Sequence, residues 1–305
     1  MATRAMGPMA GVGWLTRAVN VGRTGPGAVF GGAALLTLVV LAVGFAAGML
    51  QVALVPALGN GIAALMIGTV TVGVMVLVVV SMVLIGFLRL LHRVESGQSA
   101  RALEVFAGFR DPRTSLKTIG FFLLLAIAQN ALLVALLMAF AGGFVEWYMQ
   151  TLQVSMAGGQ PDMTELPSGT GIATLAMVVV GLLVYGVQAI GLGQIVLRGR
   201  GVFAAIGDGV VGVSKNLLPL LVFAIVCLLA ALVLTVGVLL VAMLIGLMAK
   251  FVGTWLGLVL AVPLYIAAML VMFVVMFGAM YHLWRDVCGP VTPGSDAAVS
   301  GVTPV

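Results

Sequence analysis

Long apolar stretches alternate with short polar segments along the whole chain. Each stretch is long enough to cross a hydrocarbon layer about 30 Å thick, which takes roughly 20 apolar residues of α-helix. Six such stretches contain no charged residue near their middle: 28–55, 62–88, 118–145, 171–197, 217–248 and 252–281. The pattern predicts an all-α fold, a polytopic transmembrane helix bundle of six spans.

Composition supports the same class of protein. Hydrophobic residues make up 63% of the 305 residues and charged residues only 8%, against about 25% charged residues in average soluble domains. Lipid is therefore the expected main solvent. We divide the chain into a cytoplasmic N-terminal segment (1–27), a six-span transmembrane domain (28–286) and a disordered cytoplasmic tail (287–305), which is rich in Gly, Pro, Ser and Thr. The first apolar stretch is too long for a signal peptide and is interpreted as an uncleaved span.

The distribution of charge predicts the orientation. Six crossings place thirteen of the fourteen basic residues on one side, with Lys250 alone on the other. The 146–170 loop has three acidic residues and no basic one. By the positive-inside rule, both termini lie in the cytoplasm of a bacterial inner membrane. The 64 residues from Leu217 to Met280 are long enough for three short spans, but three would place Arg285 outside. Two long spans, with Pro263 inside the second and a turn at Gly253, fit the rule.

A repeat is visible where the chain enters spans one, three and five. Each entry passes through a Gly and a basic residue, in the stretches 22–30, 108–117 and 212–223. The interpretation is three parallel copies of a short interfacial helix followed by a helical hairpin. Chance similarity is the alternative, because Gly and Arg are common before a membrane span.

Three segments have the spacing of short amphipathic helices. The first runs over 99–110, with Ser99 as N-cap and Pro112 after its end. The second covers 203–213, and the third lies in the external loop and is aromatic. Their apolar stripes are Ala102, Val105, Phe106 and Phe109; Phe203, Ile206, Val210 and Val213; and Phe144, Trp147, Tyr148 and Leu152.

Groups that carry catalysis are scarce in this sequence. The spans contain no ionisable residue near mid-depth, where proton relays and ion-coupled pumps need one. The two histidines, His92 and His282, fall at span ends and are interpreted as interfacial side chains rather than metal ligands. Cys227 and Cys288 are 61 positions apart and predict neither a disulfide nor a metal site. We therefore expect no enzyme activity, no cofactor and no metal. The net charge of +5 is explained by topology, so nucleic acid is not an expected partner.

Amides and glycines are the features that remain inside the spans. The amides are Gln129, Asn130, Gln188 and Gln194. They could line a path for a substrate or lipid headgroup, or they could make interhelical hydrogen bonds that fix the bundle, which is the simpler interpretation. Gly44 and Gly48 form a GxxxG pair in the first span, and Gly68 and Gly73 lie in the second. Such spacing allows close helix contact.

The basic segment 89–117 is the best candidate for binding. Cations beside an amphipathic helix attract anionic phospholipid, at about 1 kcal/mol per residue near the surface. Topology signalling alone explains the same charges. The expected headgroup contacts are Arg89, Arg93, Arg110, Arg113 and Lys117.

Three short motifs give the chain a resemblance to known proteins. They are Phe106-Ala-Gly-Phe-Arg110, Ser214-Lys-Asn-Leu-Leu-Pro219-Leu-Leu and the closing Tyr281-His-Leu-Trp-Arg285-Asp286-Val-Cys-Gly289. With these, the chain resembles a family of uncharacterised bacterial six-helix inner-membrane proteins, which is similar to the membrane domain fused to some glycerophosphodiester phosphodiesterases. The resemblance implies a fold and a location but no activity. Around Trp14 the sequence departs from the family pattern by lacking a second aromatic residue.

Two functions follow from these features. The first is a non-enzymatic membrane component that binds membrane lipid, anionic phospholipid in particular, or a protein partner, including a second copy of the chain. The alternative is a transporter or channel for a neutral or lipid-like solute, lined by the four amides.

Overall fold

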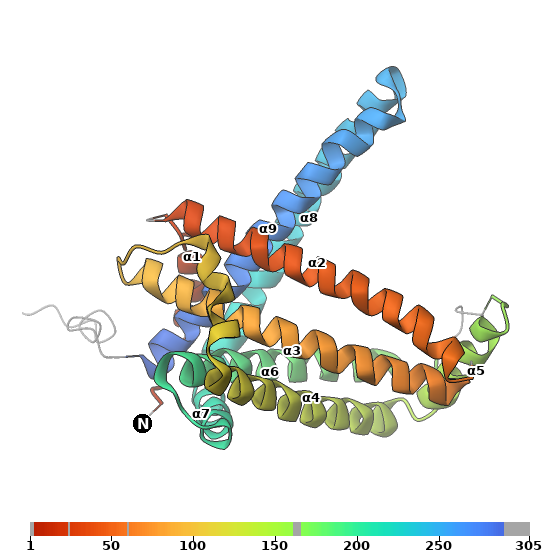
Figure 1. Ribbon diagram of the computed structural model, residues 1–305, viewed down its shortest axis with the longest axis horizontal. Helices are drawn as coiled ribbons and strands as arrows, with labels where there is room; N and C mark the ends of the chain where they lie inside the picture. Colours follow the sequence, from red (N-terminus) through yellow and green to blue (C-terminus); the bar gives the residue numbers. More distant parts are fainter. Residues whose placement is uncertain (1–2, 24, 60, 161–165, 290–305) are drawn as a thin grey trace, which may run out of the picture. The chain divides into compact units, whose positions relative to one another are not determined.

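The structure is a computed structural model that describes residues 3–23, 25–59, 61–160 and 166–289. Its described residues form ten helices and no strand (Figure 1). The four short ones are α1 (Ala10–Val19), η1 (Ala102–Arg110), α5 (Phe144–Met156) and α7 (Val202–Lys215). The six long ones are α2 (Pro26–Ala57), α3 (Ile62–Glu95), α4 (Pro112–Phe140), α6 (Thr170–Arg198), α8 (Leu217–Val252) and α9 (Thr254–Cys288).

The six long helices confirm the predicted spans, because each is long and apolar enough to cross a membrane. This is the architecture of a multi-pass membrane protein. Short and long helices also follow each other in the predicted order, with α1, η1 and α7 each preceding two long helices. The aromatic α5 lies between the two long helices of the second pair.

Several helices continue well past the predicted ends of the spans. The helix α3, which corresponds to the second predicted span, extends to Glu95 instead of 88, because Leu90, Leu91 and Val94 continue its buried face. The last runs to Cys288 and so includes the first two residues of the expected disordered tail. The rest of that tail, from 290, lies outside the described residues.

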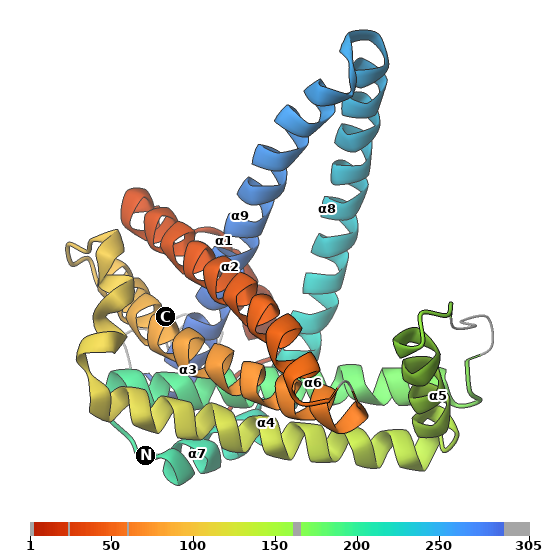
Figure 2. The same ribbon diagram turned by 45° about the vertical axis from the view of Figure 1, so that its right-hand side comes forward.

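The expected turn in the last hairpin is confirmed. The helices α8 and α9 are joined by Gly253, whose φ of 124° lies in a region that favours glycine. Pro263 lies inside α9 and does not end it. Figure 2 shows the two helices meeting at this turn and separating toward their other ends, where α1 contacts both of them.

The first amphipathic segment differs from the expected helix. It is a 3-10 helix that begins at Ala102, with Arg101 rather than Ser99 as N-cap. The Glu104 carboxylate accepts the Arg101 N–H at 3.3 Å, and the Glu104 N–H donates to the Arg101 carbonyl at 2.9 Å. A 3-10 helix has three residues per turn, so Val105 and Gly108 share one face. Both are buried, whereas the expected stripe residue Phe109 is exposed.

The chain forms two compact units. The smaller comprises residues 122–185, and the larger comprises the rest. In the smaller unit, the Phe144 ring lies 5.4 Å from the Trp147 ring and 6.4 Å from the Tyr148 ring, measured between centroids. These contacts confirm that the expected aromatic stripe lies on one face of α5.

Burial in the larger unit is concentrated at one place, which we call the packed end. It consists of α1, η1, α7 and the adjoining ends of α3, α6, α8 and α9. Most of the largest buried side chains belong to it, including Trp14, Phe87, Ile190 and Tyr281. By contrast, α8 exposes nearly all of its apolar side chains from Leu228 onward. An apolar surface of that kind is suited to lipid rather than water.

Candidate functional site

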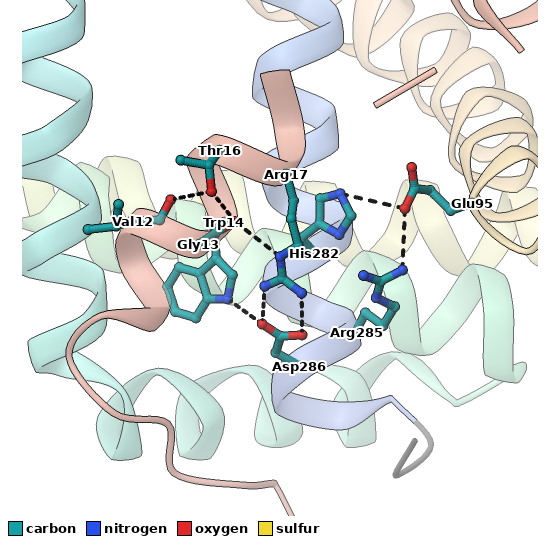
Figure 3. Close-up of polar contacts among 9 residues, drawn as sticks. All are labelled: Val12, Gly13, Trp14, Thr16, Arg17, Glu95, His282, Arg285 and Asp286. Carbon is teal, nitrogen blue, oxygen red and sulfur yellow. Dashed lines mark hydrogen bonds and ion pairs between the residues drawn. The ribbon is translucent and has the colours of Figure 1, made fainter. Parts of the chain in front are cut away.

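The last turns of α9 are the centre of a polar cluster in the packed end. On one side they contact α1, where the Asp286 carboxylate pairs with the Arg17 guanidinium and accepts the Trp14 Nε1–H at 3.0 Å (Figure 3). Arg17 Nη1 donates to the second carboxylate oxygen at 3.1 Å. Asp286 is therefore bound by two side chains from the first helix of the chain.

On the other side, α9 contacts the end of α3. His92 Nδ1 lies 3.0 Å from the Tyr281 hydroxyl, and Arg285 Nη1 donates to Glu95 Oε2 at 3.3 Å. His282 Nε2 lies 3.8 Å from the same Glu95 oxygen (Figure 3). The expectation of an interfacial side chain is wrong for His282, which is only 1% exposed. The reason is that α1 and α3 cover the face of α9 on which it lies.

Burial and charge pairing suggest what this cluster does. Its two carboxylates, Glu95 and Asp286, are each matched by a guanidinium from another helix. Partly buried pairs of this kind fix the mutual position of helices, and removing one partner leaves a charge without compensation. The arrangement holds α1, α3 and α9 together.

The expected headgroup contacts divide into two groups. The first is already engaged within the protein. Arg89 Nη2 pairs with Asp111 Oδ2 at 2.6 Å, and Arg93 Nη1 pairs with Glu104 Oε1 at 3.0 Å. Lys117 Nζ donates to the Gly199 carbonyl at 2.9 Å.

The pairing of Asp111 is strong enough to change its titration. The guanidinium of Arg89, together with the backbone N–H and hydroxyl of Thr114, lowers the pKa of Asp111 from 3.8 to about 2. Asp111 therefore stays ionised through the physiological range, and Arg89 keeps its partner. The pair links the end of α3 to the residue that precedes α4.

The second group points outward. Arg110 and Arg113 are exposed, and no acidic partner for them lies among the described residues. The same holds for Arg101. We call these three cations, with the exposed apolar side chains between them, the basic rim. The apolar members are Leu103, Phe109 and Leu116, with exposed fractions of 69%, 49% and 74%.

The four amides have separate environments. Gln194 is buried and donates from Nε2 to Asp208 Oδ2 on α7 at 2.9 Å. Asn130 donates to the Ala126 carbonyl in its own helix at 2.8 Å. Gln129 and Asn130 belong to the smaller unit, and Gln188 and Gln194 to the larger. Gln194 therefore makes an interhelical hydrogen bond, which is the simpler of the two interpretations given for the amides.

Of the four expected glycines, Gly68 of α3 meets another helix, because an added Cβ would lie 3.3 Å from Val55 Cγ2 of α2. Within the described residues, a Cβ added to Gly44, Gly48 or Gly73 would meet no atom within 4 Å. One added to Gly86 would lie 2.6 Å from the Glu104 carbonyl oxygen, and one added to Gly108 would lie 2.8 Å from the Met82 carbonyl carbon. The GxxxG pair Gly44 and Gly48 therefore makes no close helix contact within the described residues.

Sequence reasoning missed the acidic members of the packed end. Glu95, Asp208 and Asp286 each lie within ten residues of a long-helix terminus and within eight residues of a basic side chain. With only nine acidic residues in the chain, that position was the available signal. It could not show which base each acid pairs with.

Comparison with family models, curated proteins and solved structures finds no match to this chain. The similarity to the membrane domain of some glycerophosphodiester phosphodiesterases therefore stays a prediction.

Proposed function

We propose that this protein is a bacterial inner-membrane component that binds anionic phospholipid through its basic rim. The observation that carries the proposal is the division of the 89–117 cations. Arg89, Arg93 and Lys117 have partners inside the protein, whereas Arg101, Arg110 and Arg113 project from it. The rim thus keeps three charges for an external anion.

The neighbouring side chains indicate what kind of anion would bind. A soluble anion needs only the cations, but the rim alternates them with exposed Leu103, Phe109 and Leu116. Apolar side chains next to arginines match the boundary between acyl chains and headgroups. Each cation contributes about 1 kcal/mol near an anionic surface, which corresponds to roughly fivefold in affinity.

The experiment is lipid exchange in nanodiscs that contain phosphatidylglycerol and phosphatidylcholine, read by native mass spectrometry. Arg110→Gln and Arg113→Gln should each reduce the excess of bound phosphatidylglycerol roughly fivefold. Lys250→Gln is the matched control, since it also removes one exposed cation but lies at the last turn of α8. Equal losses in all three variants, or no loss in the first two, would contradict the proposal.

The proposed orientation places the packed end at the cytoplasmic face. It is supported by the basic residues, since all except Lys250 belong to the packed end or to segments adjoining it. Anionic lipid headgroups of the cytoplasmic leaflet would then be within reach of the rim. A reporter fused after residue 305 should be active only in its cytoplasmic form, and a periplasmic signal would reverse the orientation.

A further inference from the structure

The short helix η1 packs on the hairpin that precedes it in the chain, formed by α2 and α3. Gly86 of α3 and Gly108 of η1 let the two backbones approach closely. An ion pair between Arg93 and Glu104 joins η1 to the last turn of α3. Two features therefore hold the short helix on this hairpin: a glycine contact, and an ion pair near the end of the second helix of the hairpin.

The short helix α7 packs in the same way on the end of α6, the helix before it. A Cβ added to Gly209 of α7 would lie 3.0 Å from the Val187 carbonyl oxygen of α6. Asp208 of α7 pairs with Arg200, just after the end of α6, at 3.0 Å. The same two features recur, again between a short helix and the long helix before it.

No short helix follows α9 in the described residues, and the third hairpin receives α1 instead. A Cβ added to Gly11 of α1 would lie 2.6 Å from the Phe223 nitrogen of α8, and one added to Gly278 of α9 would lie 3.2 Å from Ala18 Cα. Arg17 of α1 pairs with Asp286, near the end of α9. The glycine contact and the ion pair are present, but the helix comes from the other end of the chain.

We propose that residues 3–21 are an N-terminal clasp, which supplies the C-terminal hairpin with its short helix and locks α8 to α9. The repeating unit is then a hairpin followed by the short helix that packs on it. The third unit is circularly permuted, because its short helix, α1, precedes the first hairpin in the chain. This repeating unit differs from the predicted one, in which each short helix belonged to the hairpin that follows it.

The extended residues before α1 strengthen the clasp. Asn216, at the junction of α7 and α8, is 1% exposed and binds the segment before α1 through both ends of its amide. Its Oδ1 accepts the Met6 N–H at 2.8 Å, and its Nδ2 donates to the Arg4 carbonyl at 2.8 Å. The Arg4 N–H donates to the Val287 carbonyl at 2.9 Å. The clasp is thus bound through its backbone as well as through α1.

The order of synthesis gives the clasp a consequence for assembly. Its residues are made before α9, which carries their acceptor. Until α9 is complete, Trp14 and Ala18, both fully buried in the final structure, have no hairpin to cover them. Docking of the clasp on α9 therefore follows the synthesis of α9.

A charge exchange in the full-length protein tests the clasp. The variants are R17D, D286R and the double variant R17D/D286R, and the readout is amide hydrogen exchange in detergent. Each single change should raise exchange of α1 roughly tenfold or more, as expected for loss of a charged hydrogen bond. The double variant should restore protection. Should D286R fail to fold, D286N removes the charge with little change in shape.

The matched control is R93D, which breaks the corresponding pair of η1. It should raise exchange in η1 and leave α1 protected, while R17D should do the reverse. Unchanged protection of α1 in R17D, or equal loss of protection in α1 and η1, would overturn the proposal.

A circular permutant tests the assignment to the third hairpin. Arg4 Nη2 donates to the Gly289 carbonyl at 2.8 Å, so a short Gly-Ser linker can join residue 289 to residue 3. The permutant contains residues 22–289, the linker and residues 3–21. It should insert into membranes and melt close to the wild type, and a matched chain without residues 3–21 should melt lower. A permutant no more stable than the shortened chain would show that the clasp does not act as the third short helix.

Discussion

Replacement of Gly86 by alanine tests the close contact between α3 and η1. An added Cβ would lie 2.6 Å from the Glu104 carbonyl oxygen and closer still to the Val105 carbonyl. Both neighbours are backbone atoms, so no side-chain rotation can make room. The helix η1 would have to move away from α3, which would expose Val105 and stretch the ion pair between Arg93 and Glu104.

Two opposing effects set the size of the change. Overpacking typically costs about 1–3 kcal/mol, and a rigid backbone neighbour places Gly86→Ala at the upper end. Alanine is favoured over glycine inside a helix by about 1 kcal/mol. The net expected loss is about 2 kcal/mol, or roughly 3 °C in Tm for a chain of this size.

Thermal unfolding in detergent can be followed with a thiol-reactive dye, because Cys288 is buried and becomes accessible on unfolding. Gly44→Ala is the control, since its Cβ would meet no described atom within 4 Å and should raise Tm slightly through helix propensity. If Gly86→Ala melts at or above the temperature of Gly44→Ala, the close-contact reasoning is refuted.

Three further changes test the polar contacts of the packed end. Asp111→Asn should lower Tm at pH 6, and the difference from wild type should shrink below about pH 4 and be mostly lost by about pH 2, because the lowered pKa of Asp111 contributes stability only while its carboxylate is ionised. Trp14→Phe keeps the ring but removes the donor to Asp286, and should cost about 1.5 kcal/mol or more in an unfolding titration. Asn216→Ala should free the segment before α1, seen as faster amide exchange at residues 3–6 with α3 unchanged. An Asp111→Asn difference that is as large at pH 2 as at pH 6, an unaltered Trp14→Phe protein, or uniform exchange in the third variant would count against the corresponding contact.

The fold was predictable where hydrophobicity alone determines structure. Charge-free stretches of sufficient length identified all six long helices, since only a helix satisfies its backbone hydrogen bonds within lipid. The turn at Gly253 followed from the same pattern. The ends of helices were less accurate, because α3 and α9 continue through charged residues whose opposite faces stay buried.

The site was predictable only in part. Sequence showed that residues 89–117 concentrate cations, but it treated Arg89 and Arg113 as equivalent. The structure gives Arg89 a carboxylate partner and leaves Arg113 exposed. That difference depends on where Asp111 falls after η1, which no periodicity indicates. His282 was likewise misjudged, because burial at a helix end depends on which other helices cover it.

The sequence by itself determined that the chain is helical, that it suits a membrane and that short helices precede paired long ones. These properties are local, since they depend on runs of consecutive residues. Only the tertiary structure decided that Arg17 pairs with Asp286, 269 positions away, and that α1 belongs with the last hairpin. Such pairings depend on backbone approach at Gly11 and Gly278. The chain contains 41 glycines, and the residues next to each do not show which glycines contact another helix.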